Sequence, residues 1–162
     1  EVIKRLWRTT NPAIVRFWRA CELGFKQGGK AGRITFRRIG KDMHAILPSG
    51  RALIYRDARV FHGPIEGERL TYMDPKGFRT DTWGGSIAEN VTQAVARDAL
   101  AESMVRMTER GYPIVLHVHD EIVLDGIFDV EDVANQMCEM EPWMAGLPLA
   151  AEGSTMKRYQ KG

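Results

Sequence analysis

The sequence LHVHDEIVL, residues 116–124, places ionisable side chains at the centre of an otherwise apolar run. Apolar residues, many of them β-branched, continue on both sides of this polar group. Two short runs of this kind, broken by a few polar residues, predict two buried strands joined by a tight turn. The turn would present His119, Asp120 and Glu121 together.

Carboxylates beside apolar strands are costly unless a cation or hydrogen-bond donors compensate them. A carboxylate at a strand tip suits Mg²⁺, which prefers oxygen ligands and keeps water and substrate phosphates in its other positions. This interpretation makes Asp120 a metal ligand and requires a second carboxylate from elsewhere in the fold. Two alternatives stay open. Asp120 is also a favoured turn residue, and His117 and His119, on one strand face, would suit zinc with Asp120, as in a zinc-dependent hydrolase.

Length and composition indicate one domain with a sizeable core, since 44% of the 162 residues are hydrophobic. No apolar run approaches the length of a membrane span, and the basic N-terminal region lacks a signal-peptide core. We therefore expect a cytoplasmic protein without a membrane partner. Cys21 and Cys138 are far apart, which favours neither a disulfide framework nor a zinc ribbon.

Charge is distributed unevenly along the chain. Residues 1–60 contain 14 Lys or Arg against 4 Asp or Glu, whereas residues 61–162 contain 9 against 17. A basic first part suggests a surface that meets a polyanion, although ordinary surface charge can be equally uneven.

Helix and turn signals define the expected elements. Asn11 and Pro12 suit the start of a helix that runs to about Gln27, where glycines end it. The sequence predicts β structure over residues 33–74 with turns at 48–50 and 74–77, a helix over 86–110, a helix over 130–140 and a closing strand over 147–153. Ser86 would cap the long helix, with Glu89 completing a capping box.

The long helix also carries a polar face. Asn90, Gln93 and Arg97 follow one another at three- and four-residue spacing and so share one side of the helix. Amide groups donate and accept hydrogen bonds, and arginine reaches phosphates, so this trio suits contact with a DNA minor groove. A solvated helix face is the alternative interpretation.

The segment ENVTQAVARD, residues 89–98, followed about twenty residues later by VHDE, resembles the family A DNA polymerases, above all bacteriophage and prophage members of the DNA polymerase I family. The segments NPAI (11–14), LPSGR (47–51) and GLPL (146–149) resemble the same phage group. The resemblance therefore covers essentially the whole chain.

The resemblance implies an α+β polymerase palm, in which an antiparallel sheet packs on helices, with a β-rich insertion in the N-terminal half. Residues 1–162 would be one domain, the C-terminal palm portion of a larger polymerase. Within it the resemblance implies a helical entry segment over 1–32, a β meander over 33–83 and a palm core over 84–162.

The resemblance also implies roles for individual residues. Asp120 matches the family's Mg²⁺ ligand, Glu121 a carboxylate near the metals and primer terminus, and His119 a contact to the primer end. Gln93 matches a glutamine that touches the minor groove. One position departs from the pattern, because Glu89 stands where the family has an asparagine and Asn90 follows one residue later.

The family's second metal-binding Asp, and its fingers helix that grips the incoming nucleotide, would precede residue 1. Nucleotidyl transfer in this family uses two Mg²⁺ ions about 4 Å apart, which Asp120 alone cannot hold. We therefore expect the isolated chain to be inactive. Its partners would be primer-template DNA, deoxynucleoside triphosphates and the missing N-terminal part, in a bacterial or phage-infected cell. The alternative is a noncatalytic nucleic-acid-binding fragment.

Overall fold

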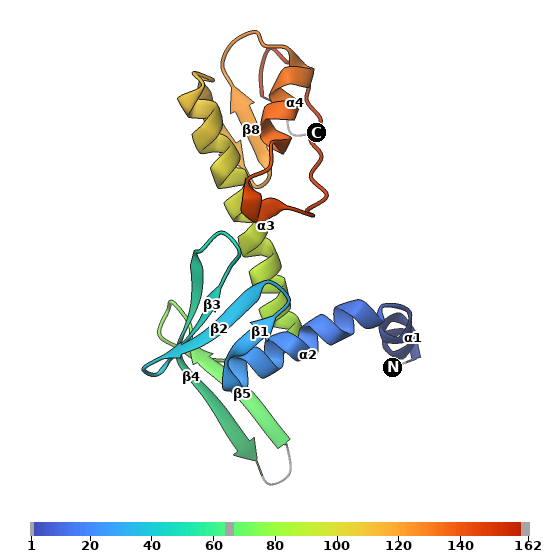
Figure 1. The fold of residues 1–162 in the computed structure, drawn as a ribbon, viewed down its shortest axis with the longest axis vertical. Coiled ribbons are helices and arrows are strands. Elements are labelled where there is room, and N and C mark those ends of the chain that lie inside the picture. The colour runs from blue at the N-terminus through green and yellow to red at the C-terminus, as the bar shows by residue number, and fades with distance from the viewer. Residues whose placement is uncertain (1, 64–66, 160–162) are drawn as a thin grey trace. The chain divides into compact units, whose positions relative to one another are not determined.

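The computed structural model describes residues 2–63 and 67–159, and the chain divides into two compact units, Glu1–Val95 and Ala96–Gly162. Figure 1 shows the helices and strands of each unit. In chain order the elements are α1 (Val2–Thr10), α2 (Pro12–Gln27), β1 (Gly29–Ala31), β2 (Ile34–Ile39), β3 (Asp42–Ile46), β4 (Ala52–Gly63), β5 (Gly67–Met73), β6 (Arg79–Thr82), α3 (Gly84–Glu109), β7 (Ile114–Val118), β8 (Glu121–Leu124), α4 (Val130–Cys138) and the 3₁₀ turn η1 (Pro142–Met144). The unit boundary lies inside α3, and the expected single domain with three segments stays a prediction.

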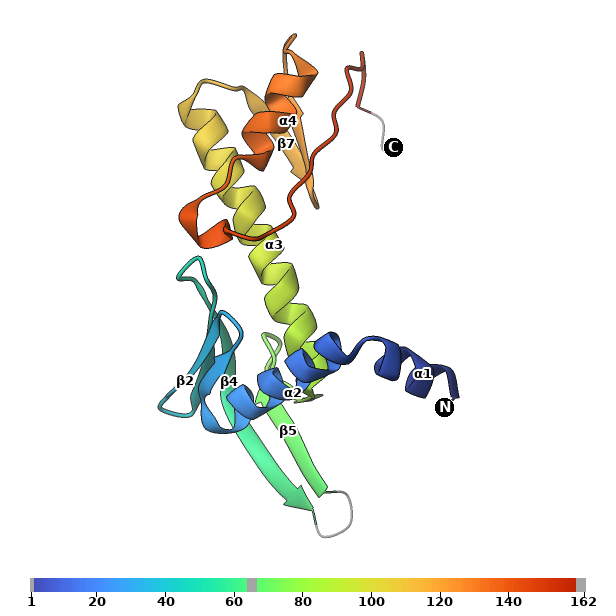
Figure 2. The same ribbon diagram turned by 45° about the vertical axis from the view of Figure 1, so that its right-hand side comes forward.

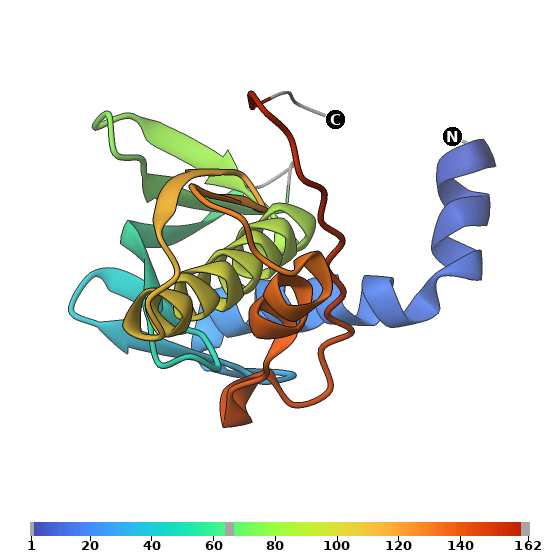
Figure 3. The same cartoon turned by 90° about the horizontal axis from the view of Figure 1, so that it is seen from above.

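Helix α2 forms over the range that the sequence predicts, with Pro12 in its first turn. The Asn11 side chain, however, makes no hydrogen bond to the start of α2. Its Nδ2 donates to the Trp7 carbonyl oxygen at 2.9 Å, so that Asn11 closes α1 instead. Viewed from above, α1, which carries the N-terminus, runs in a different direction from α2 (Figure 3). Gly28, at φ 80°, ends α2 with its N–H donating to the Gly24 carbonyl.

The first unit contains an antiparallel sheet whose six strands follow one another in sequence order, β1 to β6. This confirms the β structure expected in this part of the chain, although the strands begin at Gly29 rather than at residue 33. The predicted turn over 48–50 joins β3 to β4, where the Gly50 N–H donates to the Leu47 carbonyl at 2.9 Å. Helix α2 packs against β1 and β2, as Figure 2 shows.

The core of the first unit lies between this sheet, α2 and the first part of α3. Its fully buried large side chains come from all three elements and include Phe25, Met43, Ile87 and Val91. Helices packed on an antiparallel sheet make this an α+β fold, which confirms the predicted fold class. The N-terminal half holds the sheet, also as expected.

Helix α3 begins against the backbone of α2. A Cβ added to Gly84 would lie 2.2 Å from the Trp18 carbonyl oxygen, a distance that no real side chain tolerates. The predicted capping box is therefore wrong, because the helix starts two residues before Ser86. The Ile87 N–H donates to the Trp83 carbonyl, and Glu89 accepts instead from Gln93, at 3.3 Å from its Nε2.

In the second unit, α3 ends where the sequence predicts. Gly111 adopts φ 87°, a left-handed conformation that glycine reaches without strain. The Tyr112 N–H donates to the Met107 carbonyl and the Gly111 N–H to the Thr108 carbonyl, both at 3.0 Å. These bonds satisfy carbonyls that the end of a helix would leave unpaired.

Two arginines of α3 hold α4 in place. Arg106 donates to the carbonyls of Gln136 and Glu139, both at 2.9 Å, and thereby caps the end of α4. Arg110 pairs with the Glu139 carboxylate, and this hydrogen bond holds the pKa of Glu139 below its ordinary value. Helix α4 ends at Cys138, close to the expected position, and Asp129 caps its start by accepting from Glu131 and Asp132 N–H groups.

The hairpin β7–β8 forms as predicted, but its strands are not buried. Val115 is 61% exposed and Leu116 44% exposed, and none of the residues of the two strands is in the buried class. Apolar β-branched residues indicate that a segment forms a strand, but they do not show whether other elements pack on that strand and bury it. The expected closing strand over 147–153 is also wrong, because that stretch is irregular in the structure and pairs with no described strand.

We predict that Gly84→Ala lowers the free energy of unfolding by about 1–3 kcal/mol, the usual cost of overpacking a fitted contact. Alanine is otherwise the better helix former, by about 1 kcal/mol. Urea denaturation followed by tryptophan fluorescence measures the change. Ser86→Ala, two residues along the same helix, is the matched control and should stay near the wild-type value. Unchanged or higher stability of Gly84→Ala would show that α3 does not approach α2 in this way.

Candidate functional site

The β7–β8 turn consists of His119 and Asp120, since Val118 pairs with Glu121 across the hairpin. His119 adopts φ 54°, in the left-handed region that tight hairpin turns require. Among the described residues, only Asp57 is another non-glycine residue with a positive φ. Strained backbone of this kind is frequent at functional sites, where the surrounding structure maintains it.

The structure brings His119, Asp120 and Glu121 together at the tip of this hairpin, and all three are exposed. Solvent reaches the Asp120 carboxylate, which leaves it accessible to a ligand from outside the chain. Across residues 2–63 and 67–159, however, no three His, Cys, Asp or Glu side chains gather closely enough to hold a metal ion. His117, His119 and Asp120 thus form no ligand cluster here, and the described residues do not support the zinc alternative.

Tyr159 is a neighbour of the site that the sequence did not reveal. Its hydroxyl donates to Oε2 of Glu121 at 2.9 Å, bridging a separation of 38 residues. The bond to the carboxylate, together with partial desolvation, raises the pKa of Tyr159 above its ordinary value. Glu121 is therefore oriented by a neutral donor, whereas Asp120 beside it faces solvent.

The polar residues of α3 lie in different surroundings. Asn90 is half-buried, and its Nδ2 donates to the hydroxyl of Tyr55 at 3.3 Å. Burial raises the pKa of Tyr55 to about 12, so the phenol stays protonated near neutral pH. Gln93 is exposed in the first unit, and Arg97 is exposed on the part of α3 that belongs to the second unit. Their contacts with DNA stay predictions.

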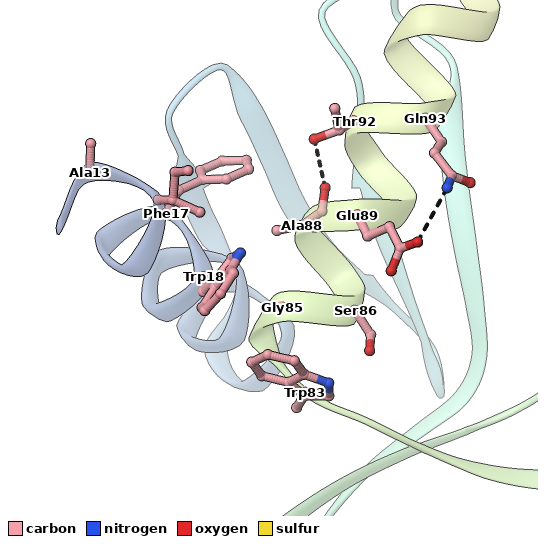
Figure 4. A pocket seen from close by; sticks show the side chains of 11 residues that line it. Ala13, Phe17, Trp18, Trp83, Gly85, Ser86, Ala88, Glu89, Thr92 and Gln93 are labelled. Atoms are coloured by element: carbon pink, nitrogen blue, oxygen red, sulfur yellow. Dashed lines mark hydrogen bonds between the residues drawn. The ribbon is translucent and has the colours of Figure 1, made fainter. Parts of the chain in front are cut away.

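A hollow of about 720 Å³ lies between α2 and the start of α3. Figure 4 shows Phe17 and Trp18 of α2 on one side and Trp83, Glu89 and Gln93 on the other. The walls are largely apolar. The sequence alone does not reveal this hollow, because nothing in the spacing of Trp18 and Trp83 indicates that the two side chains meet.

Comparison with known proteins gives one informative match. The chain is 37% identical, over 176 aligned positions, to a protein named DNA polymerase from Bacillus phage SP02. The alignment covers 99% of this chain and 27% of that protein, so the chain spans about a quarter of its relative's length. No family model matches the chain, and no solved structure matches it. Every helix in residues 2–63 and 67–159 is too short or too polar to span a bilayer.

We predict that Glu121→Gln shifts the pKa of Tyr159 back towards the ordinary tyrosine value. In the wild type the Tyr159 phenol stays protonated, and hydrogen-bonded to Glu121, until the pH rises through its raised pKa. A neutral glutamine no longer opposes the tyrosinate charge, so the titration moves to lower pH. Carbon NMR of labelled tyrosines measures the shift.

Tyr112 is the internal control for this titration, because Asp132 rather than Glu121 raises its pKa. Its titration should be the same in both proteins. A Tyr159 titration that is identical in wild type and Glu121→Gln would show that the C-terminal segment does not contact the hairpin.

Proposed function

We propose that this chain is part of a template-directed DNA polymerase of family A, which transfers nucleotides to a primer 3′ hydroxyl and releases pyrophosphate. The observation that supports it most is the exposed His119-Asp120-Glu121 turn in a chain aligned over 99% of its length with a protein named DNA polymerase. The polymerase would be a longer protein, as that relative is.

In this proposal Asp120 is a ligand of the catalytic Mg²⁺. The donor chemistry fits, since Mg²⁺ prefers carboxylate oxygens and often takes only one or two of them together with substrate phosphates and water. When bound, the metal pair would activate the primer hydroxyl and stabilise the leaving pyrophosphate. Because the described residues supply no further ligand cluster, we assign the other carboxylate to the rest of the polymerase and expect the isolated chain to be inactive.

The neighbouring residues would position the primer terminus. His119, held at a fixed backbone conformation in the turn, would contact the primer end. Glu121, oriented by the Tyr159 hydroxyl, would lie close to the metals. Gln93 would reach the minor groove from α3, and Arg97 would pair with a phosphate. The half-buried Asn90, engaged with Tyr55, would support α3 on the sheet more than it would contact DNA.

A noncatalytic nucleic-acid-binding role is the second candidate. The excess of basic residues in the first 60 positions favours it, because neutralised phosphates give affinity without any chemistry. The two candidate functions can be distinguished at Asp120, because catalysis requires its carboxylate and noncatalytic DNA binding does not.

We predict that Asp120→Asn, introduced into the complete polymerase that contains this chain, reduces primer extension with Mg²⁺ at least a hundredfold. Loss of a metal ligand removes several kcal/mol of transition-state stabilisation, and about 1.4 kcal/mol corresponds to a factor of ten. Primer extension measures the rate, and circular dichroism verifies folding.

Asp125→Asn is the matched control, since Asp125 is an exposed carboxylate just beyond β8. It should extend primers at nearly the wild-type rate. Undiminished extension by Asp120→Asn would remove Asp120 from the chemistry, and a wild-type protein that extends no primer would favour the noncatalytic role.

We further predict that Gln93→Ala and Arg97→Gln weaken duplex DNA binding in different ways. Losing the hydrogen bond of Gln93 should cost about 1 kcal/mol, roughly fivefold in affinity, with no change in salt dependence. Losing the Arg97 charge should lower the salt slope by about 0.9. Fluorescence anisotropy over a range of salt concentrations separates the two effects, and Thr92→Ala is the control on the same helix. Equal affinity and slope in all proteins would leave α3 without a DNA contact.

A further inference from the structure

Three of the four tryptophans of the chain form one continuous aromatic ladder in the first unit. Trp7 of α1 stacks on Trp18 of α2, with ring centroids 5.5 Å apart and planes inclined by 15°. Trp83, just before α3, also contacts Trp18, in an edge-to-face arrangement with ring centroids 5.3 Å apart. The ladder thus joins the consecutive helices α1 and α2 to the start of α3, which is distant from them in the sequence.

The two ends of the ladder are open to solvent. Trp7 is 43% exposed and Trp83 49% exposed, whereas Trp18 between them is half-buried. Indole rings lose a large favourable transfer energy when they stay in water. Trp7 and Trp83 each contact Trp18 and are partly exposed, so they offer ring surfaces on which a further planar group can stack.

The backbone holds Trp83 in a fixed position. A Cβ on Gly85 would lie only 2.2–2.5 Å from three carbon atoms of the Trp83 ring, so the indole rests directly on the glycine. Figure 4 shows the Trp83 ring beside Gly85, at the edge of the apolar hollow next to α2. The ring is therefore preorganised at the edge of the hollow, whose volume of about 720 Å³ lies in the range of small-molecule sites.

The charge around the ladder is positive. Helix α1 has no acidic residue among Val2–Thr10, and its Lys4, Arg5 and Arg8 are all exposed. Arg16 and Arg19 of α2 are exposed as well. Two acidic residues also lie on this part of the unit: Glu22 pairs with Lys26 at 2.7 Å, and Glu89 accepts from the neutral Gln93 amide and keeps its charge. The five exposed cations of α1 and α2 outnumber them.

We propose that the ladder of Trp7, Trp18 and Trp83, with the basic residues of α1 and α2, binds single-stranded DNA by stacking unpaired bases on its exposed indoles. Aromatic platforms flanked by positive charge bind single strands without sequence preference, because every base has a flat face and every nucleotide a phosphate. Duplex DNA keeps its bases stacked internally and cannot use the indoles. The inference rests on the proposed function and adds single-stranded DNA to the duplex that the polymerase would bind. The residues that carry it are different from those of the His119-Asp120-Glu121 turn.

The test uses the chain as it stands with a labelled oligothymidylate of about 12 nucleotides, within the range of single-strand site sizes. Binding should quench the intrinsic tryptophan fluorescence. Trp83→Ala should weaken binding roughly tenfold, as expected for the loss of base stacking. The double variant Trp7→Ala/Trp83→Ala should bind more weakly still. Replacing Lys4, Arg5 and Arg8 by Gln should lower the salt slope by about 2, at about 0.7 per neutralised phosphate.

Matched variants separate stacking from folding. Trp83→Tyr keeps an aromatic face and should retain most of the affinity, whereas Gly85→Ala keeps the indole but displaces it and should weaken binding. Trp143→Phe, which alters the one tryptophan outside the ladder, should leave affinity unchanged. Circular dichroism verifies folding of each variant.

Wild-type affinity in a folded variant that lacks Trp7 and Trp83 would overturn the inference. Failure of the wild type to bind the oligonucleotide, with self-association in sedimentation, would overturn it too and assign the ladder to a protein contact. Neither result bears on the proposed chemistry, which rests on the Asp120 turn rather than on the ladder and is tested by primer extension. Conversely, active Asp120→Asn polymerase with normal ladder binding would overturn the proposed chemistry alone.

Discussion

The close approach of α3 to α2 at Gly84 is the constraint on which the first unit depends. Only a residue without a Cβ lets the start of α3 come this near to the Trp18 carbonyl oxygen. The contact fixes where α3 begins, and therefore which of its side chains enter the core. It places Ile87 and Val91 against the sheet and α2, leaves Gln93 exposed, and sets Trp83 beside Trp18. The same contact therefore determines which side chains form the core, leaves Gln93 exposed and positions Trp83 in the aromatic ladder.

In the second unit few described side chains are fully buried, among them Met107 and Met144, and two arginines of α3 contact the segment that follows the hairpin. Arg106 caps α4 and Arg110 holds the Glu139 carboxylate, so two side chains of α3 organise the segment that follows the hairpin. The hairpin itself is short and exposed, and its tip keeps His119 at a positive φ. This arrangement sets a carboxylate in solvent beside a second one that Tyr159 engages.

Local signals predicted much of the fold, and long-range contacts explain what they missed. Pro12 and Gly111 mark helix ends through backbone properties of their own, so the sequence places both ends correctly. Ser86 was expected to cap α3, but a tertiary contact two residues earlier decides where the helix starts. The apolar, β-branched residues of β7 and β8 predicted that they form strands. Their exposure depends on tertiary contacts, which composition does not indicate. In the candidate site, the turn at Asp120 was predictable from its motif, while the partnership of Tyr159 with Glu121 joins residues with no periodic or spacing signal.

Coordination of a divalent ion by Asp120 is the central claim, and a change of metal preference tests it most directly. Asp120→Cys replaces a hard oxygen ligand with a soft sulfur ligand, which disfavours Mg²⁺ and favours a softer ion such as Cd²⁺. If the chain belongs to a polymerase, as we propose, primer extension by the complete protein should then fall sharply with Mg²⁺ and recover in part when Cd²⁺ is added, with no such recovery for Asp120→Ala. Full activity of Asp120→Cys with Mg²⁺, or a loss that Cd²⁺ restores no better than in Asp120→Ala, would contradict direct coordination.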